Sequence, residues 1–316
     1  MIPLGLRALV LVGLLLLFGD ANEARAGLLI AKSDTSNTVL RYDDSGGFLG
    51  VAASGGGLND PQGLAIGPGS DLFVSSEQSA QVLRYSGTTG AFKSVFASGG
   101  GLSYPYGLTF GPGGDLFVTS SGTNQVLRYS GTTGAFEGVF ASGGLFNPTF
   151  LRFGTGGDLF VVSYNTDQVL RFNGTTGASE GVFASGGGLS GPYGIAFSSG
   201  GDLFVDSIHT NQVLRYSGTT GAFEGVFASG GGLNGPAGLA FGPGGDLFVS
   251  SHDTNQVLRY SGTTGAFEGV FASGGLLDGP EFLLFTSNAV PEPSSVFLLA
   301  TAAAGLFGLR LVRRRR

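Results

Sequence analysis

The chain has 316 residues, a formal net charge of −6 and a hydrophobic content of 42%, with 60 Gly, no Cys and no Trp. The absence of Cys excludes disulfides and thiolate-bound zinc as sources of stability. Residues 27–288 carry nine Lys and Arg against nineteen Asp and Glu. Nucleic acid is therefore not expected as a partner, because such binding needs a basic surface.

Residues 1–26 are predicted to be a secretory signal peptide with a short helix. Arg7 gives the positive n-region, Leu9–Phe18 form an apolar h-region, and Ala24-Arg25-Ala26 resembles a small-x-small cleavage site. The apolar run is too short to span a bilayer comfortably. The sequence therefore predicts export.

The segment that follows is built from a repeat. The run Asp-Leu-Phe-Val occurs five times, at periods of 44, 43, 44 and 44 residues. Its copies begin at Asp71, Asp115, Asp158, Asp202 and Asp246. A fixed period of this size indicates stacked or ring-closed units, and turn glycines fall in phase with it. Residues common to all copies are best explained by architecture, so a specific site must come from residues that differ between copies.

One repeat contains four short apolar runs separated by turn signals: Gly238–Phe241, Asp246–Val249, Gln256–Tyr260 and Phe267–Ser273. No segment shows a sustained 3.6-residue apolar period, so helix is not expected here. Four short strands in about 44 residues are typical of one antiparallel β-propeller blade.

The two ends of the repeat region complete each other. Residues 28–31, 38–42 and 48–54 provide the second, third and fourth strands of a first blade that lacks its first strand. Phe282–Phe285 provide that missing strand, so pairing of the ends would leave no open edge. The sequence therefore predicts an all-β fold over residues 27–288, a six-bladed β-propeller of four-stranded antiparallel blades closed by strand 282–285.

The repeat resembles NHL-like six-bladed propellers over residues 27–288. The resemblance rests on Asp-Leu-Phe-Val followed by Asn-Gln-Val-Leu-Arg-Tyr, as at Asn124–Tyr129, Asn211–Tyr216 and Asn255–Tyr260. It implies a binding scaffold, and some members of this group are lactonases or lyases. An Arg recurs in the third strand of every blade, at Arg41, Arg84, Arg128, Arg171, Arg215 and Arg259. A ring of ligand-binding arginines is one interpretation; we favour structural hydrogen bonds from Arg to the repeated Asp or to the backbone, within or between blades. If such a pair is buried, its disruption should cost roughly 3–5 kcal/mol.

The loops before the first strands and after the second strands should open on one side of the ring, which we call the loop face. Residues that break the repeat gather in these loops, and they include Asp34, Glu77 and Asp167. The candidate ligand-binding residues are Gln62, Tyr106, Thr149, Tyr164, Tyr193, Asp206, His209, His252, Asp253 and Glu281. Five of these residues, Gln62, Tyr106, Thr149, Tyr193 and Glu281, directly follow a loop proline, as Ala237 does in the sixth copy, and these six positions are expected to rim the central channel. A mixture of Tyr, Asp and His side chains around the channel opening is typical of a ligand-binding site on a rigid scaffold.

No catalytic residue and no cofactor are predicted. The loops contain no nucleophile elbow or phosphate loop. His209 and His252 occupy nearly matching loop positions, but no spacing ties an acidic cluster to them. A Ca²⁺ site needs 6–8 oxygen ligands, and the scattered loop carboxylates form no Asp-x-Asp-x-Asp run. The loop carboxylates are chemically suitable ligands for Ca²⁺, but no sequence motif supports a calcium site.

Residues 289–316 have three parts in order: Pro291-Glu292-Pro293, an apolar stretch at about 296–312, and Arg313, Arg314, Arg315 and Arg316. This tail resembles the PEP-CTERM sorting signal of exported proteins from Gram-negative bacteria. The resemblance implies a transmembrane helix in the inner membrane, processing by an exosortase, and delivery to the cell surface or extracellular matrix. The Arg tail would stay cytoplasmic and anchor that helix.

Three functions remain open from the sequence. The leading hypothesis is a surface or matrix propeller that binds exopolysaccharide or another surface protein. The alternatives are a metal-dependent lactonase- or lyase-like enzyme, and a surface spacer without a ligand.

Overall fold

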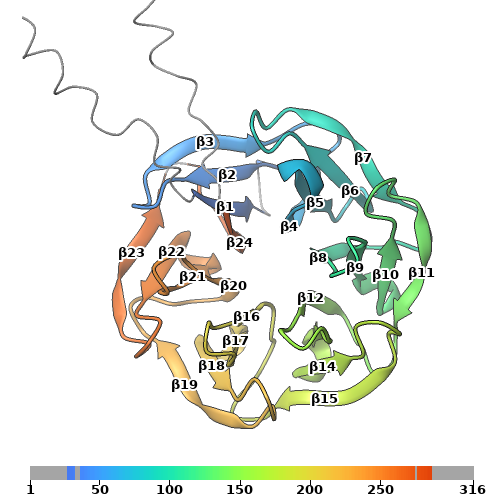
Figure 1. Ribbon diagram of the computed structural model, residues 1–316. Helices are drawn as coiled ribbons and strands as arrows, with labels where there is room; N and C mark the ends of the chain where they lie inside the picture. Colours follow the sequence, from blue (N-terminus) through green and yellow to red (C-terminus); the bar gives the residue numbers. More distant parts are fainter. Residues whose placement is uncertain (1–26, 33–35, 275, 287–316) are drawn as a thin grey trace, which may run out of the picture. The chain divides into compact units, whose positions relative to one another are not determined.

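The computed structural model describes residues 27–32, 36–274 and 276–286. These residues form six four-stranded antiparallel sheets arranged as a closed ring (Figure 1). The predicted all-β, six-bladed propeller is confirmed. The predicted signal peptide and the sorting tail lie outside the described residues, and no helix within the described part is long and apolar enough to cross a bilayer.

The four strands of each blade are given below from the innermost to the outermost. Blades one to three contain β24 (Pro280–Thr286), β1 (Gly27–Lys32), β2 (Val39–Tyr42) and β3 (Phe48–Ala53); β4 (Pro61–Ile66), β5 (Leu72–Ser76), β6 (Gln81–Tyr85) and β7 (Phe92–Ser98); and β8 (Pro105–Phe110), β9 (Leu116–Ser120), β10 (Gln125–Tyr129) and β11 (Phe136–Ala141). Blades four to six contain β12 (Pro148–Phe153), β13 (Leu159–Ser163), β14 (Gln168–Phe172) and β15 (Ser179–Ser185); β16 (Ile195–Phe197), β17 (Leu203–Ser207), β18 (Gln212–Tyr216) and β19 (Phe223–Ser229); and β20 (Pro236–Phe241), β21 (Leu247–Ser251), β22 (Gln256–Tyr260) and β23 (Phe267–Ser273).

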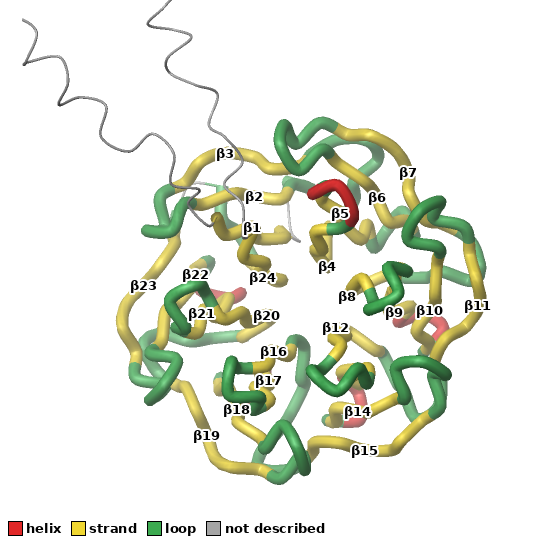
Figure 2. Tube along the Cα trace, in the orientation of Figure 1, coloured by secondary structure: helices red, strands yellow, loops and turns green. Residues whose placement is uncertain are grey.

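Short 3-10 turns occur in the loops and are coloured red in Figure 2. They are η1 (Pro68–Ser70), η2 (Ser121–Thr123), η3 (Tyr164–Thr166), η4 (Ile208–Thr210) and η5 (His252–Thr254). The last four begin directly after the second strand of their blade. They therefore lie on the loop face and shape its surface.

The ring closes where the two ends of the described chain share a sheet. β24 pairs antiparallel with β1, and the register places Leu28 opposite Phe285 and Ile30 opposite Leu283. Figure 1 shows β24 beside β1 at the inner edge of blade one. The predicted closing strand is confirmed, and it extends beyond Phe282–Phe285 by two residues at its start and one at its end.

Neighbouring blades are joined by a repeated group of three Phe rings. The Phe117 ring lies at 4.7 Å from Phe140 of its own blade and at 5.1 Å from Phe153 of the next, both edge-on. The same arrangement surrounds four other second-strand rings, Phe73, Phe160, Phe204 and Phe248. Each fully buried Phe contributes roughly 1.5–3 kcal/mol, so this packing explains why Phe recurs in phase with the repeat.

The turn between the third and fourth strands explains part of the glycine content. Gly134 in this turn has φ +71°, and a Cβ there would lie 1.7 Å from the Phe96 carbonyl oxygen of the preceding blade. Only glycine tolerates both conditions. The same clash recurs at the corresponding turn glycines, Gly177, Gly221 and Gly265.

Five of the six repeated Arg residues form ion pairs within their own blades, as the sequence suggested: Arg84, Arg128, Arg171, Arg215 and Arg259. Arg215 lies 2.6 Å from Asp202 and 2.8 Å from Glu224. The Arg side chains of these pairs are 34–46% exposed, and the paired Asp side chains are 23–32% exposed except that of Asp71, which is 5% exposed. Each pair is therefore worth about 0–1 kcal/mol, well below the 3–5 kcal/mol expected for a buried pair.

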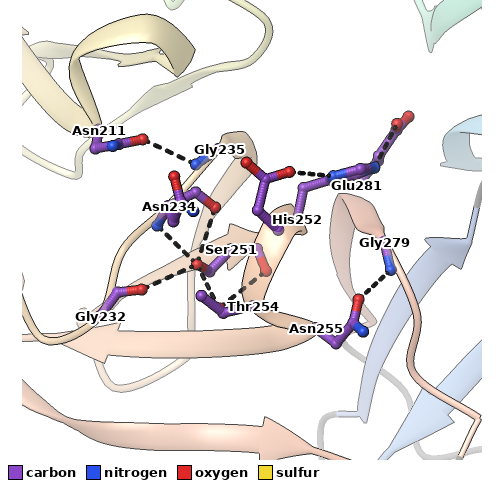
Figure 3. A network of polar contacts seen from close by, with 11 residues as sticks. Asn211, Gly232, Asn234, Gly235, Ser251, His252, Thr254, Asn255, Gly279 and Glu281 are labelled. Atoms are coloured by element: carbon purple, nitrogen blue, oxygen red, sulfur yellow. Dashed lines mark hydrogen bonds and ion pairs between the residues drawn. The ribbon is translucent and has the colours of Figure 1, made fainter.

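A side-chain hydrogen bond, which we call the clasp, links consecutive blades on the loop face. Asn211 adopts a left-handed backbone, and its Oδ1 accepts a hydrogen bond of 2.9 Å from the Gly235 N–H of the next blade (Figure 3). Four other residues, Asn37, Asn124, Asp167 and Asn255, make the same bond at 2.7–2.8 Å. Blade two has Ala80 at this position, also left-handed with φ 52°, and an Ala side chain cannot make the clasp.

We predict that Ala80→Asn stabilises the propeller by about 1 kcal/mol, because Asn suits the left-handed backbone and its Oδ1 can accept the Tyr104 N–H. Urea unfolding of the full chain measures the change. The matched control is Asn124→Ala, which removes an existing clasp and should destabilise by a similar amount. Equal or lower stability of Ala80→Asn would show that the seam between blades two and three does not need the clasp.

Candidate functional site

The residues that follow the loop prolines lie at the starts of the innermost strands, except Tyr193, which lies two residues before β16 begins. Gln62, Thr149 and Glu281 are buried, while Tyr106 and Tyr193 are half-buried. The Thr149 hydroxyl donates to the Tyr193 carbonyl at 2.9 Å. These side chains pack against neighbouring residues rather than standing around an open rim, so the sequence predicted their location but not their burial.

Tyr193 is the centre of this group. Its hydroxyl lies 3.2 Å from Gln62 Oε1 and 3.1 Å from Glu281 Oε2, across 131 and 88 residues of sequence. Its ring meets Tyr106 edge-on at 5.8 Å and tilts against Phe282 at 5.4 Å. Burial and the Glu281 carboxylate hold the pKa of Tyr193 well above its usual value, so the hydroxyl keeps its proton and acts as a donor.

Two carboxylates extend the network on the side of blade two. The Gln62 amide nitrogen donates to Asp60 Oδ1 at 3.2 Å and to Glu77 Oε2 at 3.0 Å, which directs its oxygen toward Tyr193. Burial, and then the nearby Asp60 carboxylate, raise the pKa of Glu77 to about 7. Asp60 was missed by the sequence reasoning, although it is the one carboxylate among the six residues that directly precede a loop proline; its signal was the contrast with Gly in three other copies.

His252 extends the network on the opposite side. Its Nδ1 lies 2.9 Å from Asp253 Oδ1, and its Nε2 lies 3.8 Å from Glu281 Oε1 (Figure 3). Polar contacts therefore run from Asp253 through Glu281 and Tyr193 to the acid pair of blade two. We call the seven residues that carry them the axial network: Asp60, Gln62, Glu77, Tyr193, His252, Asp253 and Glu281.

The other predicted histidine does not join His252. His209 is exposed, and its Nε2 lies 3.3 Å from the Tyr164 hydroxyl. The Tyr164 ring meets Tyr193 edge-on at 6.3 Å. The structure therefore brings Tyr164 and His209 to the border of the axial network, in a pair separate from His252.

Asp206 holds the backbone around Tyr193 through hydrogen bonds. It is fully buried, and its Oδ1 accepts hydrogen bonds from the backbone N–H groups of Tyr193 at 2.7 Å and Gly194 at 2.8 Å. β16 has three residues, where the other innermost strands have six or seven. Other blades place Ser75, Thr119 or Ser250 here. Asp206 is therefore a positioning residue that fixes the backbone of Tyr193.

The chemistry of the axial network favours a ligand rich in hydrogen-bond donors. A single Tyr193 hydroxyl proton lies between two acceptor oxygens, and four of the seven residues are acidic. Ionised carboxylates only accept hydrogen bonds. Among the described residues, no group of three or more His, Asp or Glu is arranged to hold a metal ion.

Asp206 predicts a specific pH dependence. Burial raises its pKa to about 8, against the opposing effect of the Gly194 and Tyr193 N–H groups. The folded state thus binds a proton between about pH 4 and pH 8 that the unfolded state has lost, and stability falls as pH rises through this window. The raised pKa of Glu77 acts in the same direction.

We therefore expect Asp206→Asn to unfold at a higher denaturant concentration than the wild type at pH 9, with a smaller advantage at pH 5. The Asn side chain keeps an acceptor oxygen for both N–H groups and cannot ionise. Denaturant melts at several pH values measure this. Parallel pH profiles for the two proteins would contradict a buried, titrating carboxyl.

Comparison with known proteins adds the identity of the tail. Residues 289–316 match the PEP-CTERM protein-sorting motif. This motif indicates export through a membrane-anchored intermediate that an exosortase processes, in agreement with the interpretation of the sequence. No curated protein matches this sequence.

Solved structures show the same fold at low sequence identity. A chain of the nidogen/laminin complex has a TM-score of 0.70 at 17% identity, covering 84% of this chain and 99% of that one. Virginiamycin B lyase from Staphylococcus aureus, an inactive variant with quinupristin, has a TM-score of 0.61 at 19% identity, covering 85% and 94%. A streptogramin B lyase structure has a TM-score of 0.62 at 16% identity, covering 84% and 89%. The chain is thus a six-bladed β-propeller whose residues 289–316 carry a PEP-CTERM protein-sorting motif.

Proposed function

We propose that this protein is an exported surface or matrix module whose loop face binds exopolysaccharide. The observation that carries the proposal is the axial network. Its members differ between copies of an otherwise uniform repeat, and pairwise polar contacts join them across blades that are distant in the sequence. A scaffold without a ligand needs no such group of acids around a Tyr hydroxyl, because polar groups that are removed from water cost free energy unless they are paired.

The direction of the last strand supports access to this face. β24 begins at Pro280, beside the axial network, and ends at Thr286, which pairs with Gly27 at the other end of the innermost strand. The last described residue, Thr286, therefore lies at the end of the innermost strand that is opposite the loop face.

A polysaccharide fits the site better than an acidic partner does. Sugar hydroxyls are donors for the carboxylates of Asp60, Glu77 and Glu281, and the half-buried rings of Tyr106 and Tyr193 offer apolar contact. We place the mature protein at the cell surface or in the extracellular matrix of a Gram-negative bacterium, where its own exopolysaccharide would be available.

We expect Tyr193→Phe and Glu281→Gln each to weaken retention of the protein by the producer's exopolysaccharide about tenfold or more. Both changes keep the shape of the side chain and remove hydrogen bonds to a charged group. Affinity electrophoresis of the full chain in detergent measures retention. Glu268→Gln, which removes an ion-pair partner of Arg259 on the outer strand, is the matched control. Wild-type retention of both site variants would refute the proposal.

A second candidate is a metal-dependent lactonase- or lyase-like enzyme. It is favoured by the contacts of Glu281 with both His252 and Tyr193, which join an acid, an imidazole and a phenol. Elemental analysis of the purified protein separates the two candidates. Under the binding proposal we expect no stoichiometric divalent ion. One ion per chain that disappears in Glu281→Gln would instead favour the enzyme.

A further inference from the structure

Two aromatic side chains stand out on the loop face beyond the axial network. Tyr104 is 50% exposed and Phe146 is 53% exposed. They lie in the loops before β8 and β12, one and two residues before the loop prolines. The positions corresponding to Tyr104 are Asp60, Asn147, Gly191, Gly235 and Gly279, and those corresponding to Phe146 are Asn59, Ser103, Ser190, Asn234 and Asp278. Both aromatics therefore replace small or polar residues.

Other exposed Phe residues have a structural explanation. Phe136, 42% exposed, starts an outer strand, meets Tyr129 edge-on at 5.6 Å, and covers Gly100 of the preceding loop. Phe92, Phe223 and Phe267 repeat these contacts. Tyr104 and Phe146 are not part of that repeated packing, so blade architecture does not account for their exposure.

The surroundings of Tyr104 support its ring on one side. A Cβ on Gly122 would lie only 3.0 Å from Tyr104 Cδ2, so the ring rests against a stretch of backbone that has no side chain. Other copies have Gln78, Asn165, His209 or Asp253 in place of Gly122. Tyr104 also has φ 49°, a left-handed backbone that is costly for a bulky side chain. An exposed aromatic ring is thus retained at the expense of local strain.

Charge restricts what these rings can contact. The described carboxylates of the loop face include Asp60, Glu77 and Glu281, whereas the repeated Arg residues lie near the other ends of their strands, paired with acids. Lys32 at the end of β1 is the basic residue nearest the loop face by position in its strand. A ligand with carboxylate, sulfate or phosphate groups would be repelled, whereas an ammonium group would be attracted both to the acids and to the faces of aromatic rings.

We propose that Tyr104 and Phe146 form an outer subsite of the loop face for a polysaccharide of amino sugars with free amines. This proposal rests on the proposed function and names its ligand class. The sugar rings stack on the two aromatic side chains, and ammonium groups of the chain pair with the acids of the axial network. Neutral glucans and basic peptides are the competing ligands, and the experiment below separates them.

The test compares four soluble probes by calorimetry with the full chain in detergent: a glucosamine hexamer, an N-acetylglucosamine hexamer, a β-1,4-glucose hexamer and hexalysine. We expect the glucosamine hexamer to bind most tightly and to weaken as salt is added, because its charges are screened. Tighter binding of either neutral hexamer would overturn the amine assignment. Equal binding of hexalysine would overturn the sugar assignment.

Two variants test the subsite itself. Tyr104→Asn installs the residue found at position 147 and should raise thermal stability by relieving strain, while lowering affinity for the glucosamine hexamer about tenfold. Phe146→Ser should lower affinity similarly. The matched control is Val182→Thr, an equally exposed apolar residue on the outer strand β15, which should leave affinity unchanged. A purely structural role for Tyr104 would change stability alone.

Failure of this inference can be distinguished from failure of the proposed function. If Tyr193→Phe and Glu281→Gln weaken retention by the producer's exopolysaccharide but Tyr104→Asn and Phe146→Ser do not, the outer subsite is wrong and the axial site stands. If none of the four variants changes retention, both proposals fall.

Discussion

The antiparallel pairing of β24 with β1 is the constraint on which the rest of the structure depends. It places Phe285 beside Leu28 and brings Phe282 and Glu281 to the axis. Without this pairing, blade one would lack its innermost strand and the ring would expose an unpaired edge. The Phe group that joins the last blade to the first forms only because β24 supplies Phe285 to Phe248.

Closure also explains how a uniform repeat can build an asymmetric site. Each blade contributes one residue directly after its loop proline, and the ring brings all of these positions to one axis. Tyr193 therefore contacts Gln62 and Glu281, which are far from it in the sequence. The architectural residues remain the same in every copy, so small differences at these positions change the site without disturbing the blades.

Some of these differences alter the scaffold locally. Asp206 accepts hydrogen bonds from the backbone N–H groups of Tyr193 and Gly194. The strand that follows, β16, has only three residues. Ala80 leaves the seam between blades two and three without its clasp, beside the strained Tyr104. Both departures lie next to the axial network or the aromatic pair. Backbone strain and a buried carboxyl persist there because the surrounding blades provide ample packing energy.

The sequence by itself determined the architecture, because a period of 44 residues and complementary ends at Leu28 and Phe285 leave one closed ring of six blades. It also predicted the loop face, since residues such as Tyr193 and Glu281 break the repeat at equivalent positions. Only the tertiary structure decided which of them meet: His252 lies beside Glu281 and His209 beside Tyr164. It alone revealed the burial of Gln62 and Asp206 and the partial exposure of the Arg–Asp pairs. The reason is physical, because periodicity specifies backbone positions, whereas burial and side-chain partners depend on atoms contributed by distant blades.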